Sequence, residues 1–301
     1  MKSVVEDIKK GSFKPVYLFY GEEAYLKQQY KNRLKNAVLP EGDTINLSIY
    51  SGKGIDVKEM IAQADTMPFF AEHRLLLIED SGFFKNANQQ LAEYIPSIPE
   101  ETIMLFVESE VDKRGKLYKA VSKKGSVVEF TAQNEQTLTR WILGILKTEG
   151  KMITSGAMKQ FLEKTGTDME RIRQELEKLI CYCMEKESIT EEDVAVICSE
   201  QTENKIFDMI NAMAEKKQKK AMELYYDLLA LKEPPMRILY LITRQFNLLM
   251  QVKELSEEGY SAKTISERLK MAGFIVRNCL RQAEYFSLKT LKEALQDCVR
   301  M

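Results

Sequence analysis

One segment of the sequence has the frame of a nucleotide-binding loop. The apolar run Val16–Tyr20 is typical of a β-strand, Gly21 follows it directly, and the next residues have a helical pattern. A Walker A loop reads G-x-x-x-x-G-K-[ST], because its glycines let backbone amides surround the phosphates. Laid over this segment, the pattern matches Gly21 and Lys27. It places Leu26 at the second glycine and Gln28 at the hydroxyl residue.

These two departures predict a degenerate loop. A bulky Cβ at Leu26 blocks the approach of the β-phosphate, and Gln28 cannot supply the hydroxyl that binds magnesium. The strand "RLLLIED" would correspond to the Walker B motif, with Glu79 and Asp80 as its acidic pair. We interpret Lys27, Glu79 and Asp80 as ordinary polar residues at strand ends, and we expect neither a nucleotide cofactor nor a metal ion here.

Other catalytic patterns are missing from the sequence. The single histidine, His73, has no G-x-S-x-G motif to pair with, and no cysteine forms a C-x-x-C pair. Cys181 and Cys183 lie two residues apart on an expected helix, so their side chains point in different directions. We therefore expect no intrinsic enzymatic activity and no zinc site.

The segment "TMPFFAEHR" contains two adjacent aromatic residues in a place where both cannot enter one core. Pro68 ends any helix that begins at Val57, and Phe69 and Phe70 then precede a β-strand. We expect at least one ring to be exposed, as an anchor for a partner protein. The alternative, that both rings pack beneath the following helix, is equally compatible with the local pattern.

Composition describes an ordinary globular protein. The chain has 301 residues, of which 45% are hydrophobic and 30% are charged, and no window is apolar enough for a membrane helix. The start "MKSVVEDIKKGSFK" lacks the apolar region of a signal peptide, and five cysteines are an odd number for a disulfide framework. These features favour a cytoplasmic protein without a membrane partner.

Charge is distributed unevenly along the chain. The net charge is −1, yet the part from Lys216 onward has an excess of basic residues. This region includes the run "KKQKK" with Lys216, Lys217, Lys219 and Lys220, which are candidate contacts for DNA. Such a run is more often a solvated junction between helices than a site that binds phosphate.

The first 130 residues predict an α/β domain with a five-stranded, mostly parallel sheet. Short apolar runs alternate with helical patterns, and such alternation places crossover helices on both faces of a sheet. The expected strands are Val16–Tyr20, Thr44–Tyr50, Arg74–Ile78, Thr102–Val107 and Val127–Phe130. The expected helices are Glu22–Ala37, Val57–Asp65, Asn86–Ile95 and Gly115–Val121.

The strand signal ends after Phe130, and two all-α domains are expected. Asn134 is a favourable N-cap for a helix to about Lys147, and the run "TEED" at Thr190 resembles a capping box. Pro234 and Pro235 begin a long amphipathic helix. We expect an α/β domain over residues 1–133, a small helical lid over 134–202 and a helical oligomerisation domain, or collar, over 203–301.

A sheet domain with a P-loop frame followed by a helical lid is the order of parts in AAA+ ATPases. Several longer segments are more specific and resemble the delta subunit of bacterial DNA polymerase III over nearly the whole chain. They are "KPVYLFYGEEAYL", "MPFFAEHRLLLIED", "DKRGKLYKAV", "TGTDMERIRQELEKL" and "IFDMINAMAEKKQKKAMELYYDLL". The last two are the most characteristic of that family.

The resemblance implies a non-catalytic subunit of the replication clamp loader. In that family an AAA+ frame without nucleotide carries a hydrophobic pair at a helix tip, which enters a pocket of the ring-shaped sliding clamp (the beta subunit) and opens the ring. The pair corresponds to Phe69 and Phe70 here, with Met67 and Pro68 beside it. The implied partners also include the gamma/tau ATPase subunits, delta-prime and primed DNA. Lys113, Arg114 and Lys116 would then form a solvated loop or a weak contact to the DNA backbone rather than an arginine finger.

Two other functions remain open at this stage. The chain could be an atypical AAA+ ATPase that uses Lys27 and Glu79. It could also be a nucleic-acid-binding module that acts through its basic C-terminal part without a clamp. Nucleotide binding distinguishes the first alternative from the clamp-loader function, and binding to the sliding clamp distinguishes the second.

Overall fold

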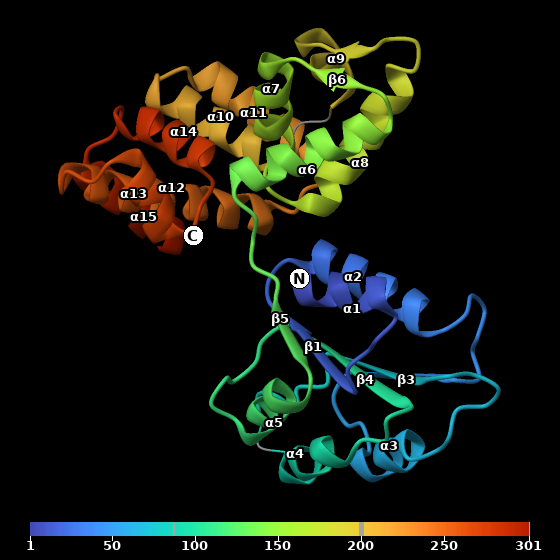
Figure 1. The fold of residues 1–301 in the computed structure, drawn as a ribbon. Helices are drawn as coiled ribbons and strands as arrows, with labels where there is room; N and C mark the ends of the chain where they lie inside the picture. The colour runs from blue at the N-terminus through green and yellow to red at the C-terminus, as the bar shows by residue number, and fades with distance from the viewer. Residues whose placement is uncertain (87, 199–201, 301) are drawn as a thin grey trace. The chain divides into compact units, whose positions relative to one another are not determined.

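The computed structural model describes all residues except 87, 199–201 and 301. The chain forms two compact units, Met1–Ala132 and Gln133–Met301 (Figure 1). The expected boundary between lid and collar at residue 202 adjoins 199–201, which lie outside the described residues. The division into three domains therefore stays a prediction.

The first unit contains a parallel sheet with five strands in the described part of the chain. Its strand order is β2-β3-β4-β1-β5, and every neighbouring pair is parallel. Crossover helices are needed to connect parallel strands, as the sequence pattern predicted. The strands are β1 (Val16–Tyr20), β2 (Leu47–Ser51), β3 (Arg74–Glu79), β4 (Thr102–Glu108) and β5 (Ser126–Glu129).

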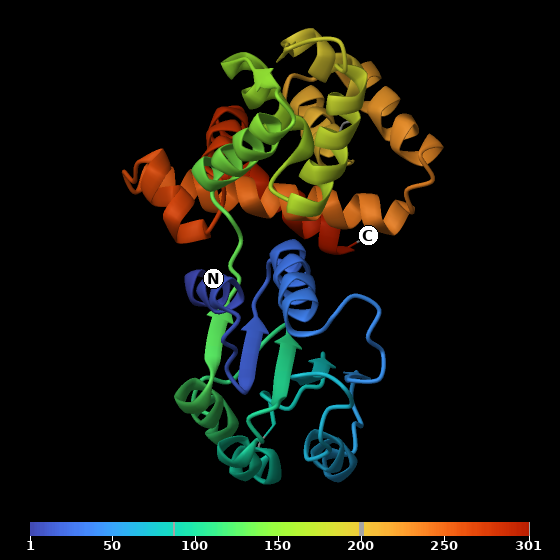
Figure 2. The same cartoon turned by 45° about the vertical axis from the view of Figure 1, so that its right-hand side comes forward.

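Helices cover both faces of this sheet (Figures 1 and 2). Alternate side chains of β1 enter two different cores, because successive residues of a strand point to opposite faces. Val16, Leu18 and Tyr20 pack with one group of helices, and Tyr17 and Phe19 pack with the other. The first group is α3 (Val57–Ala64), α4 (Gln89–Tyr94) and α5 (Lys116–Lys124); the second is α1 (Lys2–Lys10) and α2 (Ala24–Val38).

Strand direction divides the loops of this unit into two groups. The carboxyl ends of all five strands meet at one edge of the sheet, where the loop after β1 lies. The amino ends meet at the opposite edge, where the segment before β2 lies beside the segment between α3 and β3. The register of β2 and β3, with Leu47 opposite Leu75, places these two segments next to each other.

The second unit begins with helices whose caps match the sequence signals. Asn134 caps α6 (Glu135–Thr148) by accepting a hydrogen bond from the amide of Thr137, and Thr190 forms a capping box with Asp193 at α9 (Glu191–Ile197). Between them lie α7 (Ser155–Thr165) and α8 (Met169–Tyr182). The expectation that strands end after Phe130 was wrong, because β6 (Met152–Ile153) pairs in parallel with β7 (Ser188–Ile189). Strands of two residues are too short to show alternation.

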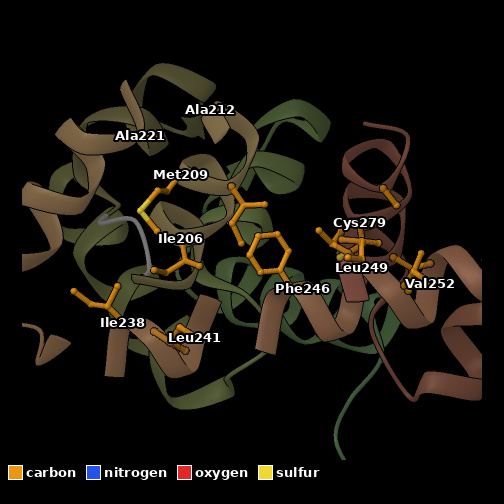
Figure 3. Close-up of a cluster of buried hydrophobic side chains, with 14 of the residues drawn as sticks. Ile206, Met209, Ala212, Ala221, Ile238, Leu241, Phe246, Leu249, Val252 and Cys279 are labelled. Carbon is orange, nitrogen blue, oxygen red and sulfur yellow. The ribbon is translucent and has the colours of Figure 1, made fainter. Parts of the chain in front are cut away.

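The remaining helices enclose an apolar core of their own. They are α10 (Thr202–Ala214), α11 (Gln218–Ala230), α12 (Pro235–Glu257), α13 (Ala262–Leu269), α14 (Gly273–Ala283) and α15 (Leu288–Arg300). Pro235 is the first residue of α12, where its missing N–H leaves no helical hydrogen bond unmade. Figure 3 shows side chains of α12 meeting those of α10, α11 and α14 in this core. The fold class expected from the sequence, an α/β domain followed by helices, is confirmed.

Asp193 should make the stability of the helical unit sensitive to acid. Its buried carboxylate accepts hydrogen bonds from Lys186 and from the amide and hydroxyl of Thr190, and the lysine contact is the main reason that its pKa falls from 3.8 to about 2. A pKa that is lower in the folded state stabilises the fold above the unfolded value, and the contribution is lost as the pH falls from about 4 to about 2.

We therefore expect Asp193→Asn to lower the melting temperature at neutral pH, with the difference from the native chain vanishing near pH 2. Glu192→Gln, at an exposed position of the same helical turn, is the control. Thermal melting across this pH range checks the prediction. A difference that does not change with pH would contradict it.

Candidate functional site

The loop after β1 is closed by backbone contacts at the carboxyl edge of the sheet. The amide of Phe130 donates to the carbonyl of Tyr20 at 2.7 Å, and the carbonyl of Phe130 accepts from the amide of Glu23 at 3.1 Å. Gly21 lies between these bonds with a φ of 118°, and a Cβ there would be 2.3 Å from the oxygen of Phe130. The glycine is therefore needed for a close approach of two backbone segments.

Lys27, the lysine of the P-loop frame, also makes its contacts within the fold. It is buried, its Nζ donates to the backbone carbonyl of Glu108 at 3.1 Å, and burial lowers its pKa. One helical turn later, Lys31 forms an ion pair with Glu79 at 2.6 Å. Leu26 packs against the core beneath α2, and the side chain of Gln28 is exposed.

The acidic residues at this edge are tied to the loops around them. Asp80 accepts a hydrogen bond from the hydroxyl of Ser109 at 3.1 Å. Glu108, which the sequence analysis did not single out, accepts from the hydroxyl and amide of Ser81 and from the amide of Gly82. Its burial raises its pKa, which these hydrogen bonds partly offset. Within the described residues, no cluster of three or more acidic, histidine or cysteine side chains could hold a metal ion.

The opposite edge of the sheet presents the aromatic loop, which we define as residues 66–70 between α3 and β3. Met67, Phe69 and Phe70 are 76%, 57% and 96% exposed, and Pro68 is half-buried. The two aromatic rings touch edge to face, with centroids 4.5 Å apart. The expectation that at least one ring is exposed is confirmed, and the alternative of two rings packed in the core is wrong.

Buried polar side chains hold the backbone of the aromatic loop. Asn46, just before β2, accepts a hydrogen bond from the amide of Phe69 at 2.7 Å and donates to the carbonyl of Phe69 at 3.0 Å. Arg74, the first residue of β3, donates to the carbonyls of Thr66 at 3.0 Å and Met67 at 3.3 Å. The rings are thus exposed on a loop whose backbone is fixed. Neither Asn46 nor Arg74 was identified from the sequence.

The lysines proposed to contact DNA lie at the junction of α10 and α11. Lys216, Lys217, Lys219 and Lys220 are all exposed. Lys217 is 2.6 Å from Glu215 and Lys219 is 4.0 Å from Glu223. Exposed ion pairs of this kind contribute little to stability. The arrangement is compatible both with a solvated junction and with a weak phosphate contact.

The loop before α5 is also exposed. Lys113 is 2.9 Å from Glu129 and lies over the ring of Tyr20, while Arg114 is bound by Asp112 at 3.0 Å. Lys116 is the exposed first residue of α5. The contacts of Lys113 and Arg114 are with acids of their own unit, as in a solvated loop.

No helix in the described part of the chain is long and apolar enough to cross a membrane. Cys181 is exposed, Cys183 and Cys198 are buried, and all of them are free thiols. The ring of His73 packs edge-on against Phe13, with centroids 5.7 Å apart.

A parallel α/β domain with a P-loop frame at its first turn, followed by helices, defines an AAA+-like protein. Two family models match regions of the chain. Residues 17–131 match "DNA polymerase III, delta subunit", and residues 203–301 match "DNA polymerase III delta subunit, C-terminal domain".

Individual relatives extend this match to almost the whole chain. DNA polymerase III subunit delta of Bacillus subtilis is 31% identical, over 99% of this chain and 89% of that protein. A probable delta subunit of Aquifex aeolicus is 21% identical, over 81% of this chain and 72% of that protein. The solved structure of the Bacillus subtilis DNA clamp loader delta protein matches with a TM-score of 0.68 and 30% identity, over 99% of this chain and 91% of that chain.

The chain therefore belongs to the DNA polymerase III delta subunit family. Membership of this family supports a clamp-loader role in DNA replication. The resemblance drawn from the sequence segments is confirmed.

Because the loop after β1 is closed by Phe130, we expect any side chain at Gly21 to lower the free energy of unfolding of the first unit. Gly21→Ala combines an unfavourable φ with a collision at Phe130, and we expect it to destabilise the first unit by about 2–3 kcal/mol. Gly54→Ala is a matched control, because Gly54 also has a positive φ, of 98°, but a Cβ added there would meet no atom within 4 Å beyond its chain neighbours. Chemical denaturation of both variants measures the difference. Equal losses would show that the contact with Phe130 does not require glycine.

Proposed function

We propose that the chain is a non-catalytic clamp-loader subunit that binds the sliding clamp through Phe69 and Phe70 and opens the ring. The observation that carries this proposal is the exposure of two adjacent aromatic rings on a loop with a fixed backbone. Exposed aromatic side chains that enter a partner's pocket are typical hot spots of protein interfaces. Met67 and Pro68 would border the contact.

Opening the clamp requires a difference in affinity rather than affinity alone. A ligand shifts a conformational equilibrium only if it binds one state more tightly than the other. The aromatic loop must therefore fit the open ring better than the closed one. The binding energy of two buried rings, roughly 1.5–3 kcal/mol each by hydrophobic transfer, is of the size needed to bias a weakened interface.

The nucleotide loop has no catalytic part in this proposal. Lys27 is bound to a backbone carbonyl and Glu79 to Lys31, so the two groups that an atypical ATPase would use already have partners. We propose that the helices of residues 203–301 join this subunit to the gamma/tau ATPase subunits and delta-prime. The complex would act on primed DNA in the cytoplasm, with Lys216, Lys217, Lys219 and Lys220 as weak contacts to the DNA backbone.

The central test changes both aromatic residues to serine. Phe69→Ser with Phe70→Ser removes two hot-spot side chains worth about 2 kcal/mol each, so clamp affinity should fall about a thousandfold. The melting temperature should hardly change, because the rings are exposed in the free chain. Surface plasmon resonance on the immobilised clamp, together with thermal melting, gives both quantities.

A matched control removes exposed apolar surface elsewhere. Met184→Ser with Val196→Ser alters side chains that are 75% and 70% exposed in the helical unit, and it should leave clamp affinity unchanged. A folded double-serine variant at Phe69 and Phe70 that still binds the clamp normally would contradict the proposal. A native chain that binds DNA but not the clamp would instead support the alternative of a clamp-independent nucleic-acid-binding module.

The second test concerns the nucleotide. Because Leu26 and Gln28 replace the glycine and hydroxyl of a Walker A loop, and Glu23 and Phe130 close the turn, the isolated chain should give no binding heat with ATP and magnesium. Isothermal titration calorimetry measures this directly. Micromolar affinity that is lost in Lys27→Ala would instead support an atypical ATPase.

A further inference from the structure

The strand order brings one polar side chain against the aromatic loop. Leu47 of β2 lies opposite Leu75 of β3, so the residue before β2 meets the segment before β3. That residue is Asn46, which is buried although it precedes an edge strand. It lies 23 positions from Phe69 in the sequence, and their contact exists only because β2 and β3 are neighbours.

The side-chain amide of Asn46 makes three hydrogen bonds at this position. Its Oδ1 accepts from the amide of Phe69 at 2.7 Å, and its Nδ2 donates both to the carbonyl of Phe69 at 3.0 Å and to Oδ2 of Asp43 at 2.8 Å. A side-chain amide that binds both the N–H and the C=O of one residue replaces the backbone of a neighbouring strand. A carboxylate of the same shape supplies acceptors but no donor.

Asp43 fixes the orientation of Asn46. Its Oδ1 accepts from the amides of Ile45 and Asn46, each at 3.0 Å, which closes a tight turn before β2. Its other oxygen accepts from the amide group of Asn46, and these bonds lower the pKa of Asp43. The turn formed by residues 43–46 is therefore rigid before any partner binds.

At the start of the aromatic loop, Arg74 donates hydrogen bonds to the carbonyls of Thr66 and Met67. Directly after the residue that Asn46 binds, Phe70 has a φ of 50°, a left-handed conformation that is disfavoured for an aromatic residue. A loop that was free to relax would leave this conformation. The ring of Phe70 is held in the solvent by bonds that its neighbours make.

We propose that Asn46, oriented by Asp43, is a positioning residue that holds Phe69 and Phe70 in their clamp-binding arrangement before the clamp arrives. This inference rests on the function proposed above, since it concerns the same surface. A preformed loop avoids the entropy cost of ordering on binding, so its loss weakens association without removing any contact atom.

The test uses the full chain and the sliding clamp of the same organism. Asn46→Ala should weaken clamp binding about 10- to 100-fold and should abolish the protection of the Phe69 amide in hydrogen exchange. Asn46→Asp keeps the shape and one acceptor but cannot donate, and it should weaken binding by a similar factor. Asn88→Ala, which removes an N-cap bond to Leu91 in the same unit, is the control for general destabilisation. It should leave clamp affinity close to native.

A double-mutant comparison separates positioning from a general effect on the fold. In the background of Phe69→Ser with Phe70→Ser, Asn46→Ala should cause no further loss of clamp binding, because the rings it positions are gone. If Asn46→Ala unfolds, Asp43→Ala, at a half-buried position of the same turn, replaces it, with an expected loss of about 5- to 20-fold in clamp affinity.

The failure of this inference is distinct from the failure of the proposed function. Native clamp affinity in folded Asn46→Ala or Asp43→Ala, together with lost binding in the double-serine variant, would overturn the positioning role alone. An equal additional loss from Asn46→Ala in the double-serine background would also overturn it. Native affinity in the double-serine variant would overturn the proposed function itself.

Discussion

The parallel direction of the five strands is the constraint on which the other features depend. It sends the loops of the first unit to two opposite edges, and the two edges have different properties. Ligands of open α/β sheets usually bind at the carboxyl edge. Here that edge is occupied by the chain's own groups, with Lys27 on the carbonyl of Glu108 and Phe130 against Gly21. The exposed aromatic loop lies at the amino edge, where β2 and β3 begin side by side.

The retained glycine and lysine of the P-loop frame thus have structural explanations. Gly21 allows the backbone of Phe130 to approach, and Lys27 donates to a buried carbonyl, so both residues make contacts within the fold itself. The polar groups at the amino edge serve a different purpose. Asn46 and Arg74 stabilise an irregular loop from behind, which leaves its apolar side chains free to contact a partner. The proposed clamp-binding surface would in this way use the α/β domain as its scaffold.

Much of the fold follows from the sequence, and the failures have identifiable causes. β1 has the bounds that its apolar run predicted, and α9 begins directly after Thr190, as the capping signal predicted. β2 begins three residues later than expected, because Asp43 draws the amides of Ile45 and Asn46 into a turn. Pro68 and the two adjacent rings predicted that at least one ring is exposed, but the local pattern was equally compatible with two rings packed beneath a helix; the structure exposes both. The role of Asn46 could not be predicted, since it depends on which strands are neighbours. An Asp-x-x-Asn turn before a strand was the only local signal.

The measurement that addresses clamp binding most directly is hydroxyl-radical footprinting of the chain with and without the sliding clamp. It reports the solvent access of individual side chains without changing any of them. We expect Met67, Phe69 and Phe70 to react readily in the free chain and to be protected in the complex, while Met184 reacts equally in both. If the two rings stayed reactive in a clamp complex that had demonstrably formed, the aromatic loop would not be the clamp-binding surface.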